Sequence, residues 1–363
     1  MLLSEIVRAE ARVVSLPLDK PLAPGFDAVE TVLLRLTDAD GAAGLGYLWC
    51  FGQSESRVLL ETLRWLAPFA VGRHELDELL AGLRARMNFF GLKGLAVFGL
   101  SAIDMALHDL LCRRQGISLS ERKGARRRRV PTYWSGFVPT ATLGELEAEA
   151  GEASARGFRA IKFRVSTGSL DEDERRLQRV MSRIPGCTVM IDVNQRWTAA
   201  ETLAAAERFA PYGIRWLEEP IVHNDYPGLA RLVQRSQIPI ASGENEYLRE
   251  GFVQLLDTGL PYLLADLQRV GGIAEWETVA RLAAERGAVL TSHAYPHVSV
   301  HLCACLEQEE IWCEYMPWFD RLFSYELELV DGELVVPRGP GIGMELDEER
   351  VEHGAHGPWE RIA

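Results

Sequence analysis

Residues 188–244 contain three short apolar runs that decide the fold: TVMIDV (Thr188–Val193), IRWLEEP (Ile214–Pro220) and IPIASGE (Ile238–Glu244). The segments between them, such as TAAETLAAAERFA, have the apolar spacing of amphipathic helices. The runs are apolar on both faces, which is typical of strands in a parallel sheet that helices cover. This alternation predicts an α/β fold with a parallel sheet.

The same alternation continues on both sides of this region. Eight apolar runs follow one another from Val130 to Met316, and they read VPTYWSG, AIKFRV, TVMIDV, IRWLEEP, IPIASGE, YLLADL, AVLTSH and IWCEYM. Eight parallel strands joined by helices favour a closed barrel over an open sheet. We therefore predict a modified TIM barrel, (β/α)7β, over residues 128–325.

The two ends of the chain predict a second domain. Residues 1–50 have the turn residues and alternation of an antiparallel meander, and helical segments follow, the last ending at Gly116. Residues 1–127 therefore predict an N-terminal α+β capping domain. Beyond the barrel, LELVDGELVVP predicts a hairpin that turns at Asp331 and Gly332. We expect residues 326–363 to return to the capping domain.

The composition argues against some classes of function. The 363 residues carry a net charge of -13, which disfavours nucleic-acid binding because phosphate affinity depends on clustered Lys and Arg. We interpret the basic run at 126–129 as a solvated linker. Six cysteines without the spacing of a disulfide scaffold predict reduced thiols. Neither a signal peptide nor a membrane span is predicted, so we expect a cytoplasmic protein with a small-molecule partner.

Polar side chains stand at the C-terminal ends of seven successive runs. In a βα barrel these ends form one rim, and active sites are built on that rim. A single strand end often carries a solvated carboxylate, but the same placement in seven runs predicts one functional site. The residues are Lys162, Arg164, Asp192, Asn194, Glu218, Glu219, Glu244, Asp266, His293 and Glu314.

Three of these residues predict a metal site. Asp192, Glu218 and Glu244 follow one another at intervals of 26 residues, so three neighbouring strands bring their carboxylates together. Three carboxylates at one point repel one another unless a cation lies between them. Hard oxygen ligands without a His or Cys partner favour Mg²⁺ over zinc. Asn194 lies on the same face as Asp192 and is a candidate for contact with a bound ligand.

The sixth and seventh runs end in Asp266 and His293. A buried Asp that accepts a hydrogen bond from one imidazole nitrogen fixes the tautomer and raises the basicity of the other nitrogen. A lone histidine is more often structural, but this one has an acidic residue at the end of the neighbouring run. His293 is therefore the candidate base.

Taken in order, the motifs resemble those of the enolase superfamily, and within it the mandelate racemase subgroup. The matching segments are GLSAIDMALHDLL, KFR, DVNQRW, WLEEP, ASGEN, ADLQRVGG, TSH and PGIGMEL. The resemblance implies one Mg²⁺ per site, held by Asp192, Glu218 and Glu244, that binds the carboxylate of a 2-hydroxy acid. It also implies that a base removes the α-proton, that the metal stabilises the enediolate, and that the protein is an even-numbered homo-oligomer.

The resemblance implies roles for the remaining rim residues. Glu314 would be the carboxylic acid that hydrogen-bonds the developing enediolate opposite the metal, a role for which we expect crowding to raise its pKa. Lys162 would contact the substrate carboxylate, as the first lysine of the usual Lys-x-Lys motif. Arg164 stands where the second lysine, the base for the opposite face of the substrate, is expected.

Arg164 decides between reactions. A guanidinium stays protonated under nearly all conditions, so Arg164 is a poor base and a good electrostatic clamp. His293 is then the one credible base, which suits β-elimination of water from an acid sugar to a 2-keto-3-deoxy acid. A racemase or epimerase of a 2-hydroxy acid is the alternative. A non-catalytic protein that binds Mg²⁺ and a carboxylate is an alternative of another class.

The resemblance also implies that the capping domain covers the site. Two segments, LDKPLAPGFDA (Leu18–Ala28) and GYLWCFG (Gly46–Gly52), would be lids, with Lys20, Phe26 and Trp49 as candidate substrate contacts. The aromatic side chains suit a polyol poorly, because a polyol needs hydrogen-bonding partners. The alternative is that these aromatics form the core of the cap and never touch the substrate.

Overall fold

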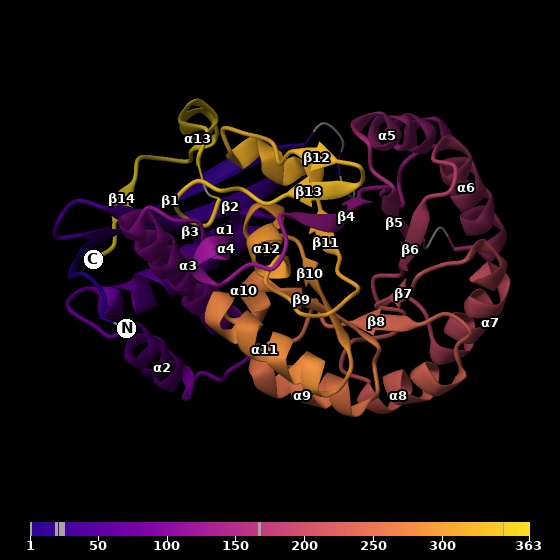
Figure 1. The fold of residues 1–363 in the computed structure, drawn as a ribbon, viewed down its shortest axis with the longest axis horizontal. Helices are drawn as coiled ribbons and strands as arrows, with labels where there is room; N and C mark the ends of the chain where they lie inside the picture. The colour runs from indigo at the N-terminus through magenta and orange to yellow at the C-terminus, as the bar shows by residue number, and fades with distance from the viewer. Residues whose placement is uncertain (1, 19–20, 22–25, 166–167, 344) are drawn as a thin grey trace.

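The structure is a computed structural model that describes residues 2–18, 21, 26–165, 168–343 and 345–363. Figure 1 shows two lobes side by side. The N-terminal residues, drawn in indigo and purple, form the left lobe, and a ring of strands and helices forms the right lobe. The C-terminal segment, drawn in yellow, crosses the top of the left lobe, so both ends of the chain lie on that side.

An antiparallel sheet forms the centre of the N-terminal lobe. Its strand order is β14-β1-β2-β3, so the last strand of the chain pairs with the first. Helices pack against this sheet, which agrees with the predicted α+β cap. The elements are β1 (Ile6–Pro17), β2 (Ala28–Asp38), β3 (Ala43–Cys50), β14 (Glu360–Arg361), α1 (Gln53–Leu66), η1 (Ala67–Ala70), α2 (Leu76–Met87), α3 (Leu95–Gln115) and α4 (Leu119–Arg122).

Helix α3 packs directly on β3. A Cβ atom at Gly44 would lie 2.1 Å from the carbonyl oxygen of Ala106, and one at Gly46 would lie 2.1 Å from that of Ala102. Glycine at both positions therefore lets the strand approach the helix closely. By length and composition α3 is also apolar enough to cross a membrane, although no membrane span was predicted from the sequence. Its most apolar window is 83% buried inside the protein, as in the core helix of a globular domain.

In the described part of the chain, eight parallel strands form the barrel of the right lobe. The strand order is β10-β9-β8-β7-β6-β5-β4, and β11 pairs with β4, so neighbours in the barrel are neighbours in sequence. The predicted (β/α)7β fold is confirmed. The strands are β4 (Arg129–Ser135), β5 (Ala160–Arg164), β6 (Thr188–Asp192), β7 (Leu217–Glu218), β8 (Ile240–Ser242), β9 (Tyr262–Asp266), β10 (Val289–His293) and β11 (Cys313–Tyr315).

Helices follow the first seven strands and surround the barrel (Figure 1). Two of them, α5 and α7, begin with capping boxes formed by Thr142 with Glu145 and by Thr198 with Glu201. The helices are α5 (Leu143–Arg156), α6 (Leu170–Arg183), α7 (Ala199–Phe209), η2 (Ala210–Tyr212), α8 (Tyr226–Arg235), α9 (Leu248–Asp257), α10 (Leu267–Val270), α11 (Ile273–Glu285) and α12 (Pro296–Cys303).

The alternation of side chains along β5 sets the direction of the rim residues. Ile161 and Phe163 belong to the core between the strands and the helices, whereas Ala160 packs inside the barrel with Trp216. Lys162 and Arg164 lie on the same face as Ala160, because successive side chains of a strand point to opposite faces. The two cations of AIKFRV therefore stand above the packed interior of the barrel.

One backbone hydrogen bond, from Ser292 to Trp312 at 3.4 Å, and two side-chain bonds close the barrel between β10 and β11. The hydroxyl of Thr291 donates to the carbonyl of Trp312 at 2.7 Å, and the hydroxyl of Ser292 accepts from the N–H of Glu314 at 2.9 Å. These bonds hold β10 against β11. His293 and Glu314 therefore reach the rim next to each other.

The C-terminal segment contacts both lobes. The hairpin of β12 (Leu329–Val330) and β13 (Glu333–Val335) adds antiparallel to β4 of the barrel. Helix α13 (Glu348–Gly354) and β14 lie against β1 of the cap, and η3 (Pro317–Leu322) leads from β11 into this segment. The predicted hairpin is confirmed, and the predicted domain boundaries stay predictions.

Candidate active site

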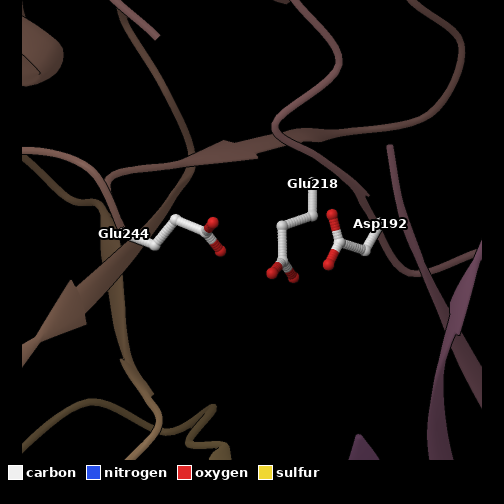
Figure 2. Close-up of side chains that lie close together, drawn as sticks. All are labelled: Asp192, Glu218 and Glu244. Atoms are coloured by element: carbon white, nitrogen blue, oxygen red, sulfur yellow. The ribbon is translucent and has the colours of Figure 1, made fainter. Parts of the chain in front are cut away.

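Three carboxylates converge at the rim. Asp192 ends β6, Glu218 ends β7 and Glu244 follows β8, and one oxygen from each lies within 4.8 Å of the others. Figure 2 shows the three side chains directed toward a common space. Burial raises the pKa of Glu218 most, Lys162 opposes this, and the two other carboxylates raise it further. The group has the donor atoms that a hard divalent cation requires.

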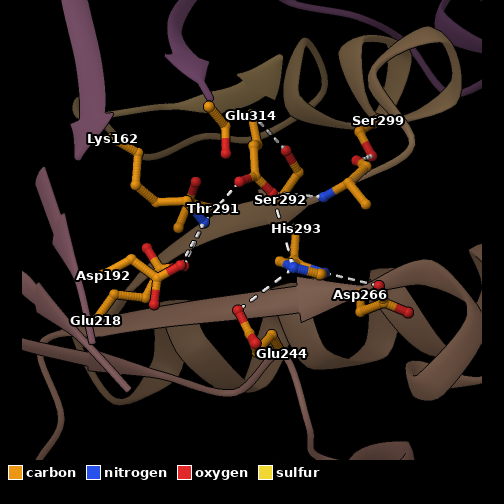
Figure 3. Close-up of polar contacts among 12 residues, drawn as sticks. Lys162, Asp192, Glu218, Glu244, Asp266, Thr291, Ser292, His293, Ser299 and Glu314 are labelled. Atoms are coloured by element: carbon orange, nitrogen blue, oxygen red, sulfur yellow. Dashed lines mark hydrogen bonds and ion pairs between the residues drawn. The ribbon is translucent and has the colours of Figure 1, made fainter. Parts of the chain in front are cut away.

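Lys162 contacts two of these carboxylates and is fully buried. Its Nζ is 2.5 Å from Glu218 Oε1, 2.6 Å from Glu314 Oε1 and 3.7 Å from Asp192 Oδ2 (Figure 3). Burial alone would lower the pKa of Lys162, but the three carboxylates outweigh burial and raise it. The ammonium group therefore stays charged and pairs with protein groups. It is not among the residues that line the cavity described below.

Two neighbours orient the carboxylates. Asn194 donates from its backbone N–H and from Nδ2 to the carboxylate of Asp192, at 2.9 and 3.1 Å. Glu219 accepts from a serine hydroxyl and from the N–H of Gly243, both at 2.8 Å, and so ties the loop that holds Glu244 to β7. Glu219 thus supports the site from outside the three converging carboxylates.

Asp266 and His293 come together as the sequence predicts. Nδ1 of His293 lies 2.7 Å from Asp266 Oδ2, and Nε2 lies 3.3 Å from Glu244 Oε2. The other oxygen of Asp266 accepts from two backbone N–H groups at the start of α10, both at 3.0 Å. Burial would lower the pKa of His293, but Glu244, Glu314 and Asp266 raise it to about 9. The imidazole is fixed with Nε2 toward the converging carboxylates.

Glu314 differs from the expectation. Its Oε1 pairs with Lys162, and its Oε2 accepts from the N–H of Ala294 at 2.7 Å. Burial acts to raise the pKa of Glu314, but Lys162 and His293 outweigh it and lower the pKa below its ordinary value. The expectation of a raised pKa is therefore wrong for this arrangement. The nearby cations, rather than the crowding of carboxylates, decide its charge.

Arg164 is held on three sides. Nη1 donates to the carbonyl of Gly136 at 2.5 Å, Nη2 donates to Ser135 Oγ at 3.1 Å, and Nε lies 3.4 Å from Asp192 Oδ2. Burial would lower the pKa of Arg164, but Asp192 and the other carboxylates raise it. Its guanidinium is thus charged and fixed in place, which agrees with an electrostatic clamp.

A cavity of about 380 Å³ opens above the rim. Phe26 and Trp49 line it, and Phe51 packs between them with ring centroids 5.4 and 5.2 Å away. Lys20, the third predicted contact of the lid, lies outside the described residues. The lining is partly polar and partly apolar, and the apolar residues come from the cap and from the barrel segments that follow β4 and β11. The polar residues are Arg164, Asp192, Asn194, Arg196, Glu244, Arg269 and His293, and the apolar ones are Phe26, Trp49, Phe51, Val138, Pro139, Met316 and Trp318.

Two cations of this cavity were not predicted from the sequence. Arg196 and Arg269 line it, and Nη1 of Arg269 also lies 3.3 Å from Asp266 Oδ2. They follow the ends of β6 and β9 by a few residues, within the motifs DVNQRW and ADLQRVGG. Neither arginine stands at the end of an apolar run, where the rim residues were predicted. The loops that follow the strands would have identified both arginines.

Two sequence families match the chain. Residues 145–350 match the family described as "Enolase C-terminal domain-like". Residues 8–124 match the family described as "Mandelate racemase / muconate lactonizing enzyme, N-terminal domain". The first match spans most of the barrel, and the second spans most of the cap.

Several enzymes are similar over most of their length. The 3,6-anhydro-alpha-L-galactonate cycloisomerase of Streptomyces coelicolor is 30% identical over 326 residues, which cover 89% of this chain and 90% of that protein. The L-talarate/galactarate dehydratase of Salmonella typhimurium is 28% identical, over 88% of this chain and 81% of that protein. A solved structure of L-talarate dehydratase from a Polaromonas species, complexed with Mg and L-glucarate, is 28% identical with a TM-score of 0.88 and covers 97% and 98% of the two chains.

Proposed function

The chain belongs to the mandelate racemase and muconate lactonizing enzyme family of the enolase superfamily, and from this membership we propose that it uses Mg²⁺ and His293 to remove the α-proton of a carboxylate substrate. We further propose that the reaction is β-elimination of water from an acid sugar, which gives a 2-keto-3-deoxy acid. The main support is the His293 and Asp266 pair, whose second imidazole nitrogen faces the converging carboxylates.

The residues present fit one Mg²⁺. Asp192, Glu218 and Glu244 would hold it, since each offers one carboxylate oxygen within 4.8 Å of the others and Mg²⁺ prefers such hard oxygen ligands. The Polaromonas dehydratase was crystallised with Mg, which supports the same ion here. When bound, the ion supplies positive charge that withdraws electrons from the substrate carboxylate and acidifies the adjacent C–H bond.

Lys162 would bind the substrate carboxylate. In the structure its ammonium group pairs with Glu218 and Glu314. If the Glu218 carboxylate turned toward a bound cation, one N–H donor of Lys162 would become free for the substrate. Glu314 would keep the ammonium group in place. Asn194, Phe26 and Trp49 would contact the rest of the substrate, because each lines the cavity.

The α-proton would pass to Nε2 of His293, because Asp266 holds Nδ1. Glu244 is one of the groups that raise the pKa of His293. If Glu244 also bound a cation, its carboxylate would raise the pKa of His293 less. The neutral imidazole, which a base requires, would then be favoured. The imidazolium that forms then donates its proton to the hydroxyl leaving the β-carbon, so a single group serves both steps.

Arg164 favours elimination over racemisation. Its three nitrogens face Gly136, Ser135 and Asp192, and a guanidinium in this position does not accept a proton from the second face of the substrate. Its charge would instead attract the anionic substrate. This leaves His293 as the base of a one-base reaction.

The test is a screen of mono- and diacid sugars with the purified protein and Mg²⁺. We expect a keto acid that a carbonyl reagent traps. The same reactions run in D₂O report exchange of the α-proton, and Arg164→Lys should gain exchange on the second face. Exchange by the wild-type protein without keto acid would show a racemase or epimerase instead. Tight binding of an acid with neither outcome would show a binding protein.

A second candidate is a cycloisomerase, in which the oxygen bonded to the β-carbon is part of a ring. The apolar wall that includes Phe26, Trp49 and Trp318 supports it, because the C–H face of a compact ring needs fewer hydrogen bonds than an open polyol. The cycloisomerase of Streptomyces coelicolor shows that relatives of this chain act on such compounds. Mass spectrometry separates the two reactions, since dehydration loses one water and cycloisomerisation conserves mass.

A further inference from the structure

Glu149 supports the loop that follows β4. It lies on α5, and its Oε1 accepts two hydrogen bonds, from Nε1 of Trp134 at 2.9 Å and from the backbone N–H of Phe137 at 3.0 Å. Both bonds end on the same oxygen atom. The proposed reaction assigns no role to this carboxylate.

The bond from Phe137 connects Glu149 to Arg164 through one peptide unit. The N–H of Phe137 and the carbonyl of Gly136 belong to the same peptide plane, and in a trans peptide they point in opposite directions. The N–H donates to Glu149, and the carbonyl accepts from Arg164 Nη1 at 2.5 Å. A carboxylate and a guanidinium therefore hold opposite sides of one peptide, and each hydrogen bond polarises the peptide for the other.

This peptide needs such support. Phe137 has a φ of 52°, in the left-handed region that a residue with a bulky side chain rarely adopts. The space beside Gly136 is filled by the carboxylate, since a Cβ there would lie 1.7 Å from Glu149 Oε1. The contacts with Glu149 and Arg164 stabilise a backbone conformation that is unfavourable by itself.

We propose that Glu149 is a positioning residue that fixes the guanidinium of Arg164 beside Asp192. The proposal rests on the proposed function, because it takes Asp192 as a metal ligand. Without Glu149 the peptide is free to turn, and Nη1 of Arg164 loses its acceptor. A buried cationic donor then turns to the nearest carboxylate, which is that of Asp192, 3.4 Å from Nε. There it competes with a bound cation.

The test titrates the full-length protein with Mn²⁺ alone and records the melting temperature of each variant. We expect Glu149→Ala to bind Mn²⁺ about tenfold more weakly, the size of effect that groups supporting metal ligands usually have. Glu149→Gln should stay within about twofold of the wild type, because its amide oxygen replaces the one oxygen that accepts both bonds. Glu152→Ala, on the next turn of α5, is the matched control and should not change binding.

Two further variants separate positioning from a purely structural role. In an Arg164→Met background, Glu149→Ala should have no further effect on Mn²⁺ affinity, since the residue through which it acts is gone. Gly136→Ala should reproduce the weaker binding, because the added Cβ displaces the carboxylate without removing it.

Unchanged Mn²⁺ affinity in Glu149→Ala would overturn the proposal, as would a loss that persists in the Arg164→Met background. A wild-type protein that does not bind Mn²⁺ would overturn the proposed function, and the positioning role with it.

Discussion

Two of the buried Asp–His pairs among the described residues make an informative comparison, one at the barrel rim and one inside helix α3. At the rim, Nδ1 of His293 lies 2.7 Å from Asp266. In α3, Nε2 of His108 lies 3.7 Å from Asp104, and neither ring nitrogen of His108 has a hydrogen-bond partner in the described structure. The pKa of His293 is raised to about 9, whereas that of His108 is lowered well below its ordinary value.

The surroundings of the two pairs explain the difference. Burial lowers the pKa of both imidazoles. Carboxylates outweigh burial at His293, whereas at His108 the cations of Lys123 and Arg122 lower the pKa further. Asp104 also accepts a hydrogen bond from the N–H of Ile273, and so caps α11 and docks the cap on the barrel. Two residue types in contact therefore do not identify a catalytic pair. The charges around the imidazole and the cavity that reaches it distinguish the pair at the rim from the pair in α3.

The largest expected difference between the pairs is the effect of removing each histidine. His293→Gln should lower the rate of α-proton removal by about 10⁴-fold, the upper range for loss of a general base. The same substitution at His108 should leave the rate within about threefold, because His108 touches no reacting group. The rates are measured with the acid that the screen identifies. Equal losses in both variants would show that His293 acts through the fold.

Substitution of the two aspartates should change the rate in the same direction as substitution of the histidines, with a smaller effect. Asp266→Asn should lower the rate about 100-fold, because an uncharged amide orients the imidazole less well and no longer stabilises its charged form. Asp104→Asn should leave it nearly unchanged. Steady-state rates of both variants at saturating Mg²⁺ give the comparison. A full rate in Asp266→Asn would contradict the role of Asp266 in the pair.

The positions of the rim residues follow from local rules. Side chains alternate along a strand, and parallel strands of a barrel end on one side, so AIKFRV and WLEEP already place their charged residues at the rim. The same rules bring Asp266 and His293 to adjacent strands. This is why the fold and the groups that meet at the rim could be predicted without knowledge of any contact.

The charge of Glu314 depends instead on contacts between distant segments. Lys162 on β5 and the N–H of Ala294 after β10 reach it only when the barrel is closed. No local sequence pattern reports such contacts. Crowding by carboxylates was therefore expected to decide the charge of Glu314, and it does not. The burial of α3 likewise follows from its packing on β3, which the apolar sequence of the helix does not distinguish from a membrane span.

A third contrast is the effect of substitutions in the two regions on the stability that a bound metal provides. A cation that binds only the folded protein stabilises it by about 2.7 kcal/mol at a concentration 100 times its Kd. We expect Mg²⁺ to raise the melting temperature of the wild type and of Asp104→Asn alike. Glu218→Gln should lose most of this increase, since it replaces one of the three charged carboxylate ligands with a neutral amide. An undiminished increase in Glu218→Gln would place the metal elsewhere.

The smallest effect concerns pH and separates the pairs without any substrate. Burial raises the pKa of Asp104 to about 7, above its unfolded value of 3.8, so the folded protein favours the protonated carboxyl. The stability that this carboxyl contributes is complete below the unfolded pKa and is lost as pH rises through about 7. From pH 6 to pH 7.5 the wild type should therefore lose about 1 kcal/mol more than Asp104→Asn, whose side chain does not ionise. Chemical denaturation of both proteins at the two pH values measures it. Equal losses of stability in the two proteins would mean that Asp104 ionises as readily in the folded state as in the unfolded chain. The N–H groups at the start of α11 would then compensate for its burial.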